Sequence, residues 1–350
     1  MSRQLTVLVD VTERCNLRCV MCYFSTTDRI RFPPFDVEPD GNGNMPVELF
    51  AKMAGDFFPK ARQVSIGCAT EPLMHPQIGE MLGHAGRHGV PEIWMLTNLL
   101  PLTEATAAAI AGNITTMSVS IDGVRKETYE RIRVGATWER LMAKLQLLRE
   151  ASRRRGPLLR VTFTWMRANR AELRELPEFA ADLGAKELDV RYVAETPGAD
   201  FEAQTLNSED PRALRDELAS TARDAVRRGL RLAAYPEFDA RPASLFARIA
   251  WRFWRVRAGI DRFEHLGMVR HERATGCRYP DRYYIVRPSG AVFPCHYYDE
   301  PIGFAGSDTL LSIAKGPKLS AIRNGLQCGN PAGACATCET RRDALYRAGA

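Results

Sequence analysis

The first 190 residues alternate between strand-like and helix-like segments, and this alternation constrains the fold more than any other feature. Six apolar runs have the length and β-branched content of buried strands: 6–12, 64–69, 92–98, 115–122, 159–166 and 188–193. Five stretches between them carry apolar residues at helical spacing: 46–58, 77–88, 103–111, 137–153 and 171–183. Repeated strand–helix units require right-handed crossovers onto parallel strands. The pattern therefore predicts a doubly wound sheet or a barrel, and six units fall short of the eight of a closed barrel.

The alternation stops after residue 194. Residues 195–274 read as helical and charged, and from residue 275 onward the chain reads as short hairpins, turns and cysteines. Within 276–298, two strands are predicted to be joined at Pro288-Ser289-Gly290. The sequence thus predicts three parts: an α/β domain over 1–194, a helical bridging segment over 195–274 and a small α+β domain over 275–350.

Composition narrows the class of protein. With 350 residues and 45% hydrophobic content, the chain can bury a large core. We find no signal peptide and no apolar stretch near the ~20 residues that span a bilayer, so a cytoplasmic location is predicted. Because that compartment is reducing, clusters among the nine cysteines are predicted to bind metal rather than to form disulfides. The formal charge of +6 suits anionic substrates or surfaces, and no nucleic-acid partner is predicted.

Polar residues follow the ends of successive predicted strands. Cys15, Cys19 and Cys22 follow the first strand, Glu71 the second, and Thr97-Asn98 the third, while the fourth ends in "SVSIDG" (118–123). In α/β barrels the loops after the strands carry the chemistry. These side chains are therefore expected to converge on one mouth. Three thiols alone also suit structural zinc.

Over residues 5–193 the sequence resembles the radical S-adenosylmethionine (radical SAM) enzymes. The resemblance lies in the order of the motifs: the CxxxCxxC trio, the Glu-Pro turn, the Thr-Asn pair, and "SVSIDG" followed by "YERIRVG" (129–135). The resemblance implies a partial (β/α)6 TIM-type barrel. It also implies a [4Fe–4S] cluster held by three cysteines, whose fourth iron binds S-adenosylmethionine and donates the electron that cleaves it to a 5′-deoxyadenosyl radical. A flavodoxin or ferredoxin is the implied electron donor.

The same resemblance assigns cofactor contacts. Glu71 would accept a hydrogen bond from the methionine amino group, and Thr70 would line its path. The ribose or carboxylate would be contacted by Asn98, Ser120 and Arg133. Met21 replaces an aromatic residue that the family often has before the third cysteine, which leaves Tyr23 as the aromatic contact. Helix-start or capping duty remains the alternative for Glu71, Asn98 and Ser120.

A second cysteine set resembles the SPASM/twitch segments that many radical SAM enzymes carry. It consists of Cys277, Cys295, Cys335 and Cys338. Four thiolates complete the ligation of a second, auxiliary [4Fe–4S] cluster, although four-cysteine zinc is an alternative. Because no cysteine follows Cys338, the single-cluster twitch form fits better. Cys328 is a candidate hydrogen-atom donor or substitute ligand, and Cys68 is a weaker candidate donor.

A fully ligated second cluster suits electron transfer. By resemblance to twitch-bearing aminocyclitol dehydrogenases, the chain is predicted to be an oxidoreductase that dehydrogenates a sugar, cyclitol or other alcohol. The alternatives are an epimerase that uses Cys328, a peptide-modifying (RiPP) maturase and a zinc-bound interaction protein. Only fourteen residues precede Cys15, so no built-in leader-binding domain is expected for a maturase.

The segment 244–273 contains a basic, aromatic, amphipathic helical pattern. Such a helix can lie on an anionic membrane surface or clamp a phosphorylated or lipid-linked substrate. The segment is therefore a candidate lid or docking surface with peripheral membrane contact. The alternative is an ordinary helix that packs its apolar face on the core.

Overall fold

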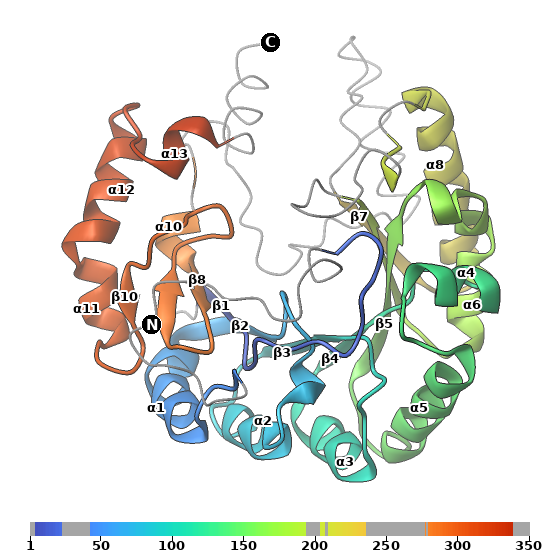
Figure 1. The fold of residues 1–350 in the computed structure, drawn as a ribbon, viewed down its shortest axis with the longest axis horizontal. Helices are drawn as coiled ribbons and strands as arrows, with labels where there is room; N and C mark the ends of the chain where they lie inside the picture. The colour runs from blue at the N-terminus through green and yellow to red at the C-terminus, as the bar shows by residue number, and fades with distance from the viewer. Residues whose placement is uncertain are drawn as a thin grey trace.

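The computed structural model describes residues 4–22, 43–193, 204–206, 209–235, 277 and 279–338. One ten-stranded sheet runs through it in the order β10-β9-β8-β1-β2-β3-β4-β5-β6-β7 (Figure 1). The strands are β1 (Leu5–Val9), β2 (Ala61–Ile66), β3 (Glu92–Thr97), β4 (Thr116–Ser120), β5 (Leu158–Trp165), β6 (Glu187–Tyr192), β7 (Arg231–Tyr235), β8 (Tyr283–Val286), β9 (Ala291–Phe293) and β10 (Gly303–Phe304). All pairs from β8 through β1 to β7 are parallel, whereas β9 and β10 are antiparallel.

The sheet curls into a partial barrel with its helices on the outside (Figure 1). These helices are α1 (Val47–Phe57), α2 (Ile78–Gly86), α3 (Glu104–Asn113), α4 (Lys126–Ile132), α5 (Trp138–Ala151), α6 (Leu176–Asp182) and α8 (Pro211–Arg227). Among the described strands, β7 and β10 are the two ends of the order, so the barrel stays open between them. The partial-barrel fold predicted from the sequence is confirmed.

The six predicted strands are all present, with small shifts at their ends. Helix α4 was not predicted, and two further elements differ from the prediction. The stretch 171–183 is a 3-10 helix, η4 (Arg167–Arg174), followed by α6, because Pro177 cannot donate the backbone hydrogen bond that would join them. Part of the predicted bridging segment, 209–235, forms α8 and a seventh parallel strand, β7, on β6.

The two faces of the sheet have different chemistry. Outward-facing residues such as Val64, Met95, Val119 and Leu188 are fully buried against the helices and form the main core. The inward-facing residues of β4, β5 and β6 are largely polar. Because side chains alternate along a strand, a polar inner face implies a barrel interior built for more than packing.

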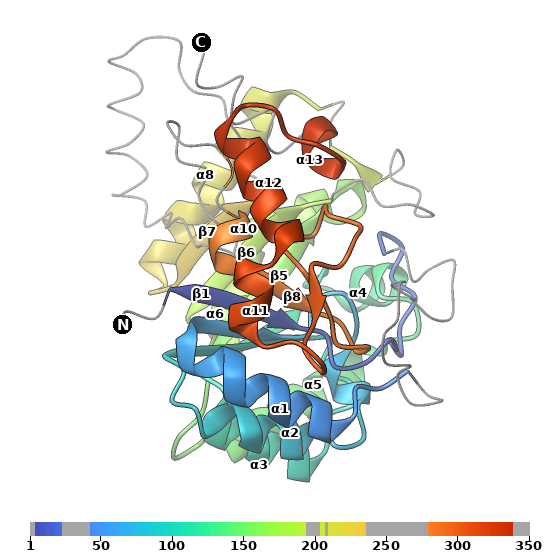
Figure 2. The ribbon, with the colours of Figure 1, turned by 90° about the vertical axis from the view of Figure 1, so that its left-hand side faces the viewer.

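The C-terminal part of the chain continues the same sheet. β8 pairs with β1 from Thr6↔Tyr283 to Val9↔Val286. β8 and β9 form the predicted hairpin, with Gly290 at φ +83° in its turn, a conformation that favours glycine. The helices of this part are α10 (Tyr279–Arg282), α11 (Leu310–Lys315), α12 (Pro317–Gln327) and α13 (Ala334–Thr337). Figure 2 shows α11 and α12 in front of β8 and above α1.

In the described part of the chain, no helix combines the length and the apolar character that crossing a membrane requires. The amphipathic segment 244–273 lies outside the described residues.

Candidate active site

The first cysteine loop follows β1 and is tied to the segment after α4. Backbone bonds run from Arg18 N to Val134 O (2.9 Å) and from Val20 N to Ile132 O (3.0 Å). Cys19 is buried, and Cys15 and Cys22 are half-buried. Burial raises the pKa of the Cys15 thiol to about 12 and that of Cys19 to about 11. Such thiols are protonated at neutral pH unless a metal displaces the proton, so ligation here would release protons.

Glu71 connects this loop to the end of β3. Its carboxylate accepts hydrogen bonds from Thr97 Oγ1 (2.5 Å), Asn98 N (2.6 Å) and Leu73 N (3.1 Å). Burial outweighs these bonds and raises the pKa of Glu71 to about 7. The bond to Leu73 caps the 3-10 turn η3 (Pro72–Met74), which is the helix-start role left open above. A contact of Glu71 with the methionine amino group stays a prediction.

Asn98 is the residue that reaches the first cysteine. Its Nδ2 lies 3.9 Å from Cys15 Sγ and donates to Asn16 Oδ1 at 2.9 Å. The next residue, Leu99, has φ +69° and is the single non-glycine residue with positive φ in the described part of the chain. Strained backbone of this kind persists only where its surroundings fix it. The turn after β3 is therefore held firmly against the cysteine loop.

The other predicted cofactor contacts have separate partners. Thr70 Oγ1 donates to Thr12 O at 2.7 Å, and Ser120 is half-buried at the end of β4. Arg133 Nη2 lies 2.6 Å from Asp122 Oδ2, and the guanidinium partly offsets the burial that raises the pKa of Cys19. Tyr23 lies outside the described residues. The structure thus brings Asn98 and Arg133 beside the cysteines, while the cofactor contacts of all these residues stay predictions.

Sequence reasoning missed a polar link across the barrel mouth. Asp10 is fully buried; its Oδ1 accepts from Cys68 N (2.9 Å) and Ala69 N (3.1 Å), and its Oδ2 is ion-paired with Arg287. The link joins the ends of β1, β2 and β8. Asp10 could have been noticed because it is a charged residue at the end of a predicted buried strand. Nothing in the sequence around Arg287 indicates that it would pair with Asp10.

The second cysteine set surrounds one pocket. Cys277, Cys295, Cys335 and Cys338 line it together with apolar residues such as Ile322 and Leu326. Burial raises the pKa of Cys277 to about 12 and of Cys295 to about 11. Soft thiol donors around an apolar pocket suit an iron–sulfur cluster. In the described residues, no three His, Cys, Asp or Glu side chains are grouped around the position of a single metal ion.

The two remaining cysteines differ in position. Cys328 is exposed at the C-terminal cap of α12 and is not among the residues that line the pocket. Cys68 packs against the apolar cluster of Leu8, Tyr283 and Phe293, which also contacts Cys277 and Cys295. Cys68, unlike Cys328, therefore shares an apolar cluster with two members of the second cysteine set.

Comparisons with known proteins agree with this geometry. A family model described as the radical SAM superfamily matches residues 9–180, and one described as an iron-sulfur cluster-binding domain, SPASM, matches residues 277–339. The chain belongs to the radical SAM superfamily and carries a SPASM domain. The predicted cofactors, a [4Fe–4S] cluster with S-adenosylmethionine and an auxiliary iron–sulfur cluster, are confirmed at this level.

Individual relatives are distant. A GTP 3′,8-cyclase of Marinobacter nauticus is 25% identical over 240 residues, which is 69% of this chain and 67% of that relative. The chain spans 43–67% of the length of the curated relatives it matches. Their names include cyclases, a heme synthase and a bacteriocin biosynthesis protein, so the relatives do not fix one reaction.

Solved structures show the same fold. Streptococcus suis SuiB bound to S-adenosylmethionine has a TM-score of 0.67 at 15% identity, over 92% of this chain and 68% of that one. SuiB bound to its precursor peptide SuiA gives 0.64 at 16%, over 92% and 67%. The structure anSMEcpe with AdoMet and the peptide Cp18Cys gives 0.61 at 14%, over 97% and 88%.

Proposed function

We propose that this protein is a radical SAM oxidoreductase that dehydrogenates an alcohol group of its substrate, a sugar, cyclitol or related alcohol. One hydrogen atom would leave the alcohol carbon for the 5′-deoxyadenosyl radical, and the hydroxyl group would lose its proton to solvent. Cys15, Cys19 and Cys22 would hold the first cluster, and Cys277, Cys295, Cys335 and Cys338 the second. When bound, the first cluster supplies the electron that turns S-adenosylmethionine into a hydrogen-abstracting radical, and the second supplies an acceptor for the substrate's remaining electron. A flavodoxin or ferredoxin is the proposed reductant.

One observation carries the proposal: contacts link both cysteine sets to the strands of the same barrel. Asn98 joins the first set to the end of β3. The cluster of Leu8, Tyr283 and Phe293 contacts Cys277 and Cys295 of the second set and also Cys68, which lies after β2. A substrate inside the barrel would therefore have a radical source on one side and an electron acceptor on the other.

The chain's own residues supply position and shielding. Asp10 and Arg287 lock the C-terminal part against the barrel mouth. Glu71 and Asn98 hold the first cysteine loop against β3. Firm placement of reacting groups lowers the entropic part of a barrier, and exclusion of water protects a reactive radical from side reactions.

Peptide modification is the second candidate. It is favoured by the two solved structures of like fold that hold peptides, SuiB with SuiA and anSMEcpe with Cp18Cys. The oxidation proposed above can act on a peptide side chain as well as on a free alcohol, so the two candidates differ in substrate rather than in the use of the second cysteine set.

The test is anaerobic incubation of reconstituted protein with reductant, S-adenosylmethionine and panels of sugars, cyclitols and peptides, read by mass spectrometry. A product two hydrogens lighter supports the proposal, and its source panel identifies the substrate class. A product with the mass of the substrate in H2O, which gains one deuterium when the reaction is run in D2O, would indicate epimerisation instead. A protein that never forms 5′-deoxyadenosine with any panel would contradict the proposal.

A further inference from the structure

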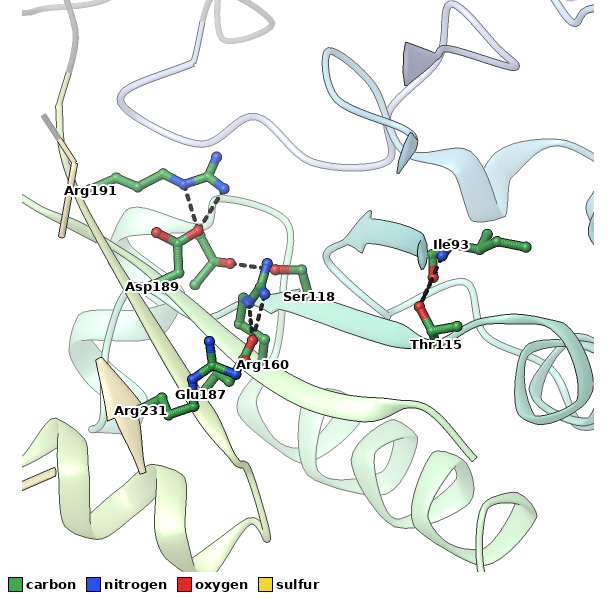
Figure 3. Close-up of polar contacts among 9 residues, drawn as sticks. Ile93, Thr115, Ser118, Arg160, Glu187, Asp189, Arg191 and Arg231 are labelled. Carbon is green, nitrogen blue, oxygen red and sulfur yellow. Dashed lines mark hydrogen bonds and ion pairs between the residues drawn. The ribbon is translucent and has the colours of Figure 1, made fainter. Parts of the chain in front are cut away.

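Two arginines on neighbouring strands, Arg160 on β5 and Arg191 on β6, lie on the inner face of the barrel (Figure 3). Each is held by a carboxylate. Arg160 on β5 donates from Nε to Glu187 Oε2 at 2.8 Å, and its guanidinium carbon lies 4.2 Å from the centre of the Trp94 ring. Arg231 Nη1 lies 3.1 Å from the other Glu187 oxygen. Arg160 and Glu187 are almost fully buried. Arg160 and Glu187 thus form a buried ion pair, whereas the Arg231 side chain is exposed.

Arg191 lies four residues after Glu187 on the same face of β6 and is in a different situation. Its Nε and Nη2 both donate to a single oxygen, Asp189 Oδ2, at 2.9 and 2.6 Å. Asp189 is fully buried, whereas the Arg191 side chain keeps 21% of its surface exposed. Within the described residues, Nη1 has no hydrogen-bond partner, and Figure 3 shows it pointing away from Asp189.

Arg191 is the second-last residue of β6, at the edge of the parallel sheet where Cys68 follows β2 and Asp122 follows β4. The guanidinium is close enough to interact electrostatically with Cys68 at the end of β2 and with His296, the neighbour of Cys295. It also interacts with Asp122, the partner of Arg133 beside Cys19. Arg191 therefore faces the region in which the proposed substrate would lie.

We infer that Arg191, held in place by Asp189, binds an anionic group of the substrate, a carboxylate or a phosphate, and so fixes the substrate between the two cysteine sets. The inference rests on the proposed function. A guanidinium with one edge fixed still presents N–H groups suited to a carboxylate or phosphate. Because Asp189 prevents rotation of the side chain, less conformational entropy is lost when the anion binds. Arg160 cannot act in this way, since Glu187 and Trp94 enclose it.

The test is a binding measurement that needs no turnover. Reconstituted full-length protein with S-adenosylmethionine is titrated anaerobically by calorimetry with inorganic phosphate or with glutarate, at constant ionic strength. The variants are Arg191→Gln, Arg191→Lys and, as a matched control, Arg231→Gln, which alters the exposed partner of Glu187. The two probes distinguish a phosphate-bearing from a carboxylate-bearing substrate.

We expect Arg191→Gln to weaken binding of one probe at least tenfold, Arg191→Lys to weaken it less, and Arg231→Gln to leave it unchanged. Since Arg191→Gln leaves the buried Asp189 without its cation, the double variant Asp189→Asn/Arg191→Gln provides a charge-free pair if the single variant loses iron or secondary structure. The inference is overturned if the wild-type protein binds neither probe, or if these variants bind both probes as the wild-type protein does. Neither result depends on whether substrate is oxidised.

Discussion

The two cysteine sets are built from different surroundings. The first lies on a loop whose neighbours are polar: Asn98 reaches Cys15, and Arg133 with its partner Asp122 lies beside Cys19. The second lines a pocket whose other walls include Ile322 and Leu326. A site that receives a polar ligand requires hydrogen-bonding groups near its metal, whereas a fully ligated electron-transfer site is tuned by burial. The contrast supports a cofactor-binding role for the first set and an electron-accepting role for the second.

The largest expected effect comes from breaking the first set. Loss of a residue that only hydrogen-bonds to a metal ligand typically costs roughly 10–100-fold in activity. Cys19→Ser removes a ligand itself, so it should lower 5′-deoxyadenosine formation by more than that. Iron content should fall from about eight to about four per chain, since each cluster holds four. Anaerobic iron analysis and product chromatography measure both. A variant that retained full iron and activity would show that Cys19 is no ligand.

Breaking the second set should separate the two functions. In Cys335→Ser, iron should again fall to about four per chain, but 5′-deoxyadenosine should still form within a few-fold of the wild-type rate. Substrate oxidation should be lost, because the remaining electron has no acceptor. The ratio of oxidised product to 5′-deoxyadenosine measures this uncoupling. If the ratio stays at its wild-type value, the second set has no part in the oxidation.

Both sets should respond alike to pH during cluster assembly. Burial raises the thiol pKa to about 12 for Cys15 and Cys277, and to about 11 for Cys19 and Cys295. The ligating form is the thiolate, and well below the pKa its fraction rises about tenfold per pH unit. Reconstitution should therefore speed up between pH 7 and pH 9 and release protons. Absorbance of the cluster and a pH dye follow the two processes; a rate independent of pH would contradict the expectation.

The sequence predicts this molecule unevenly. The strands that carry β-branched runs and the cysteine loops could be predicted, because their signals are local. The strand β7, "RLAAY", could not, because two alanines give no strand pattern and its place is set by pairing with β6. Nor could the Asp10–Arg287 pair, whose members are 277 positions apart. The family likeness indicated Glu71, but only the structure shows that its carboxylate already accepts from Thr97 and Asn98.

Glu71 therefore gives a smaller and pH-dependent prediction. Its pKa rises from an ordinary 4.5 to about 7 on burial, so folding favours the protonated acid. This contribution to stability is fully present below about pH 4.5 and is lost as the pH rises through about 7. Between pH 5 and pH 8, the free energy of unfolding of the cluster-free wild-type protein should fall by about 1–3 kcal/mol relative to Glu71→Gln. Urea unfolding of both proteins at each pH measures the difference, and parallel curves would contradict the shift.

The smallest effect is expected at Cys328, and it sharpens the boundary of the second set. Cys328 is exposed and does not line the pocket formed by Cys277, Cys295, Cys335 and Cys338. Cys328→Ser should therefore keep about eight irons per chain and an unchanged ratio of oxidised product to 5′-deoxyadenosine. The matched variant Cys68→Ser changes the thiol that packs beside Tyr283 and Phe293, near the proposed substrate. If Cys328→Ser lost iron, Cys328 would be a ligand after all. If Cys328→Ser abolished solvent-deuterium incorporation into an epimerised product while Cys68→Ser did not, Cys328 would be the hydrogen donor.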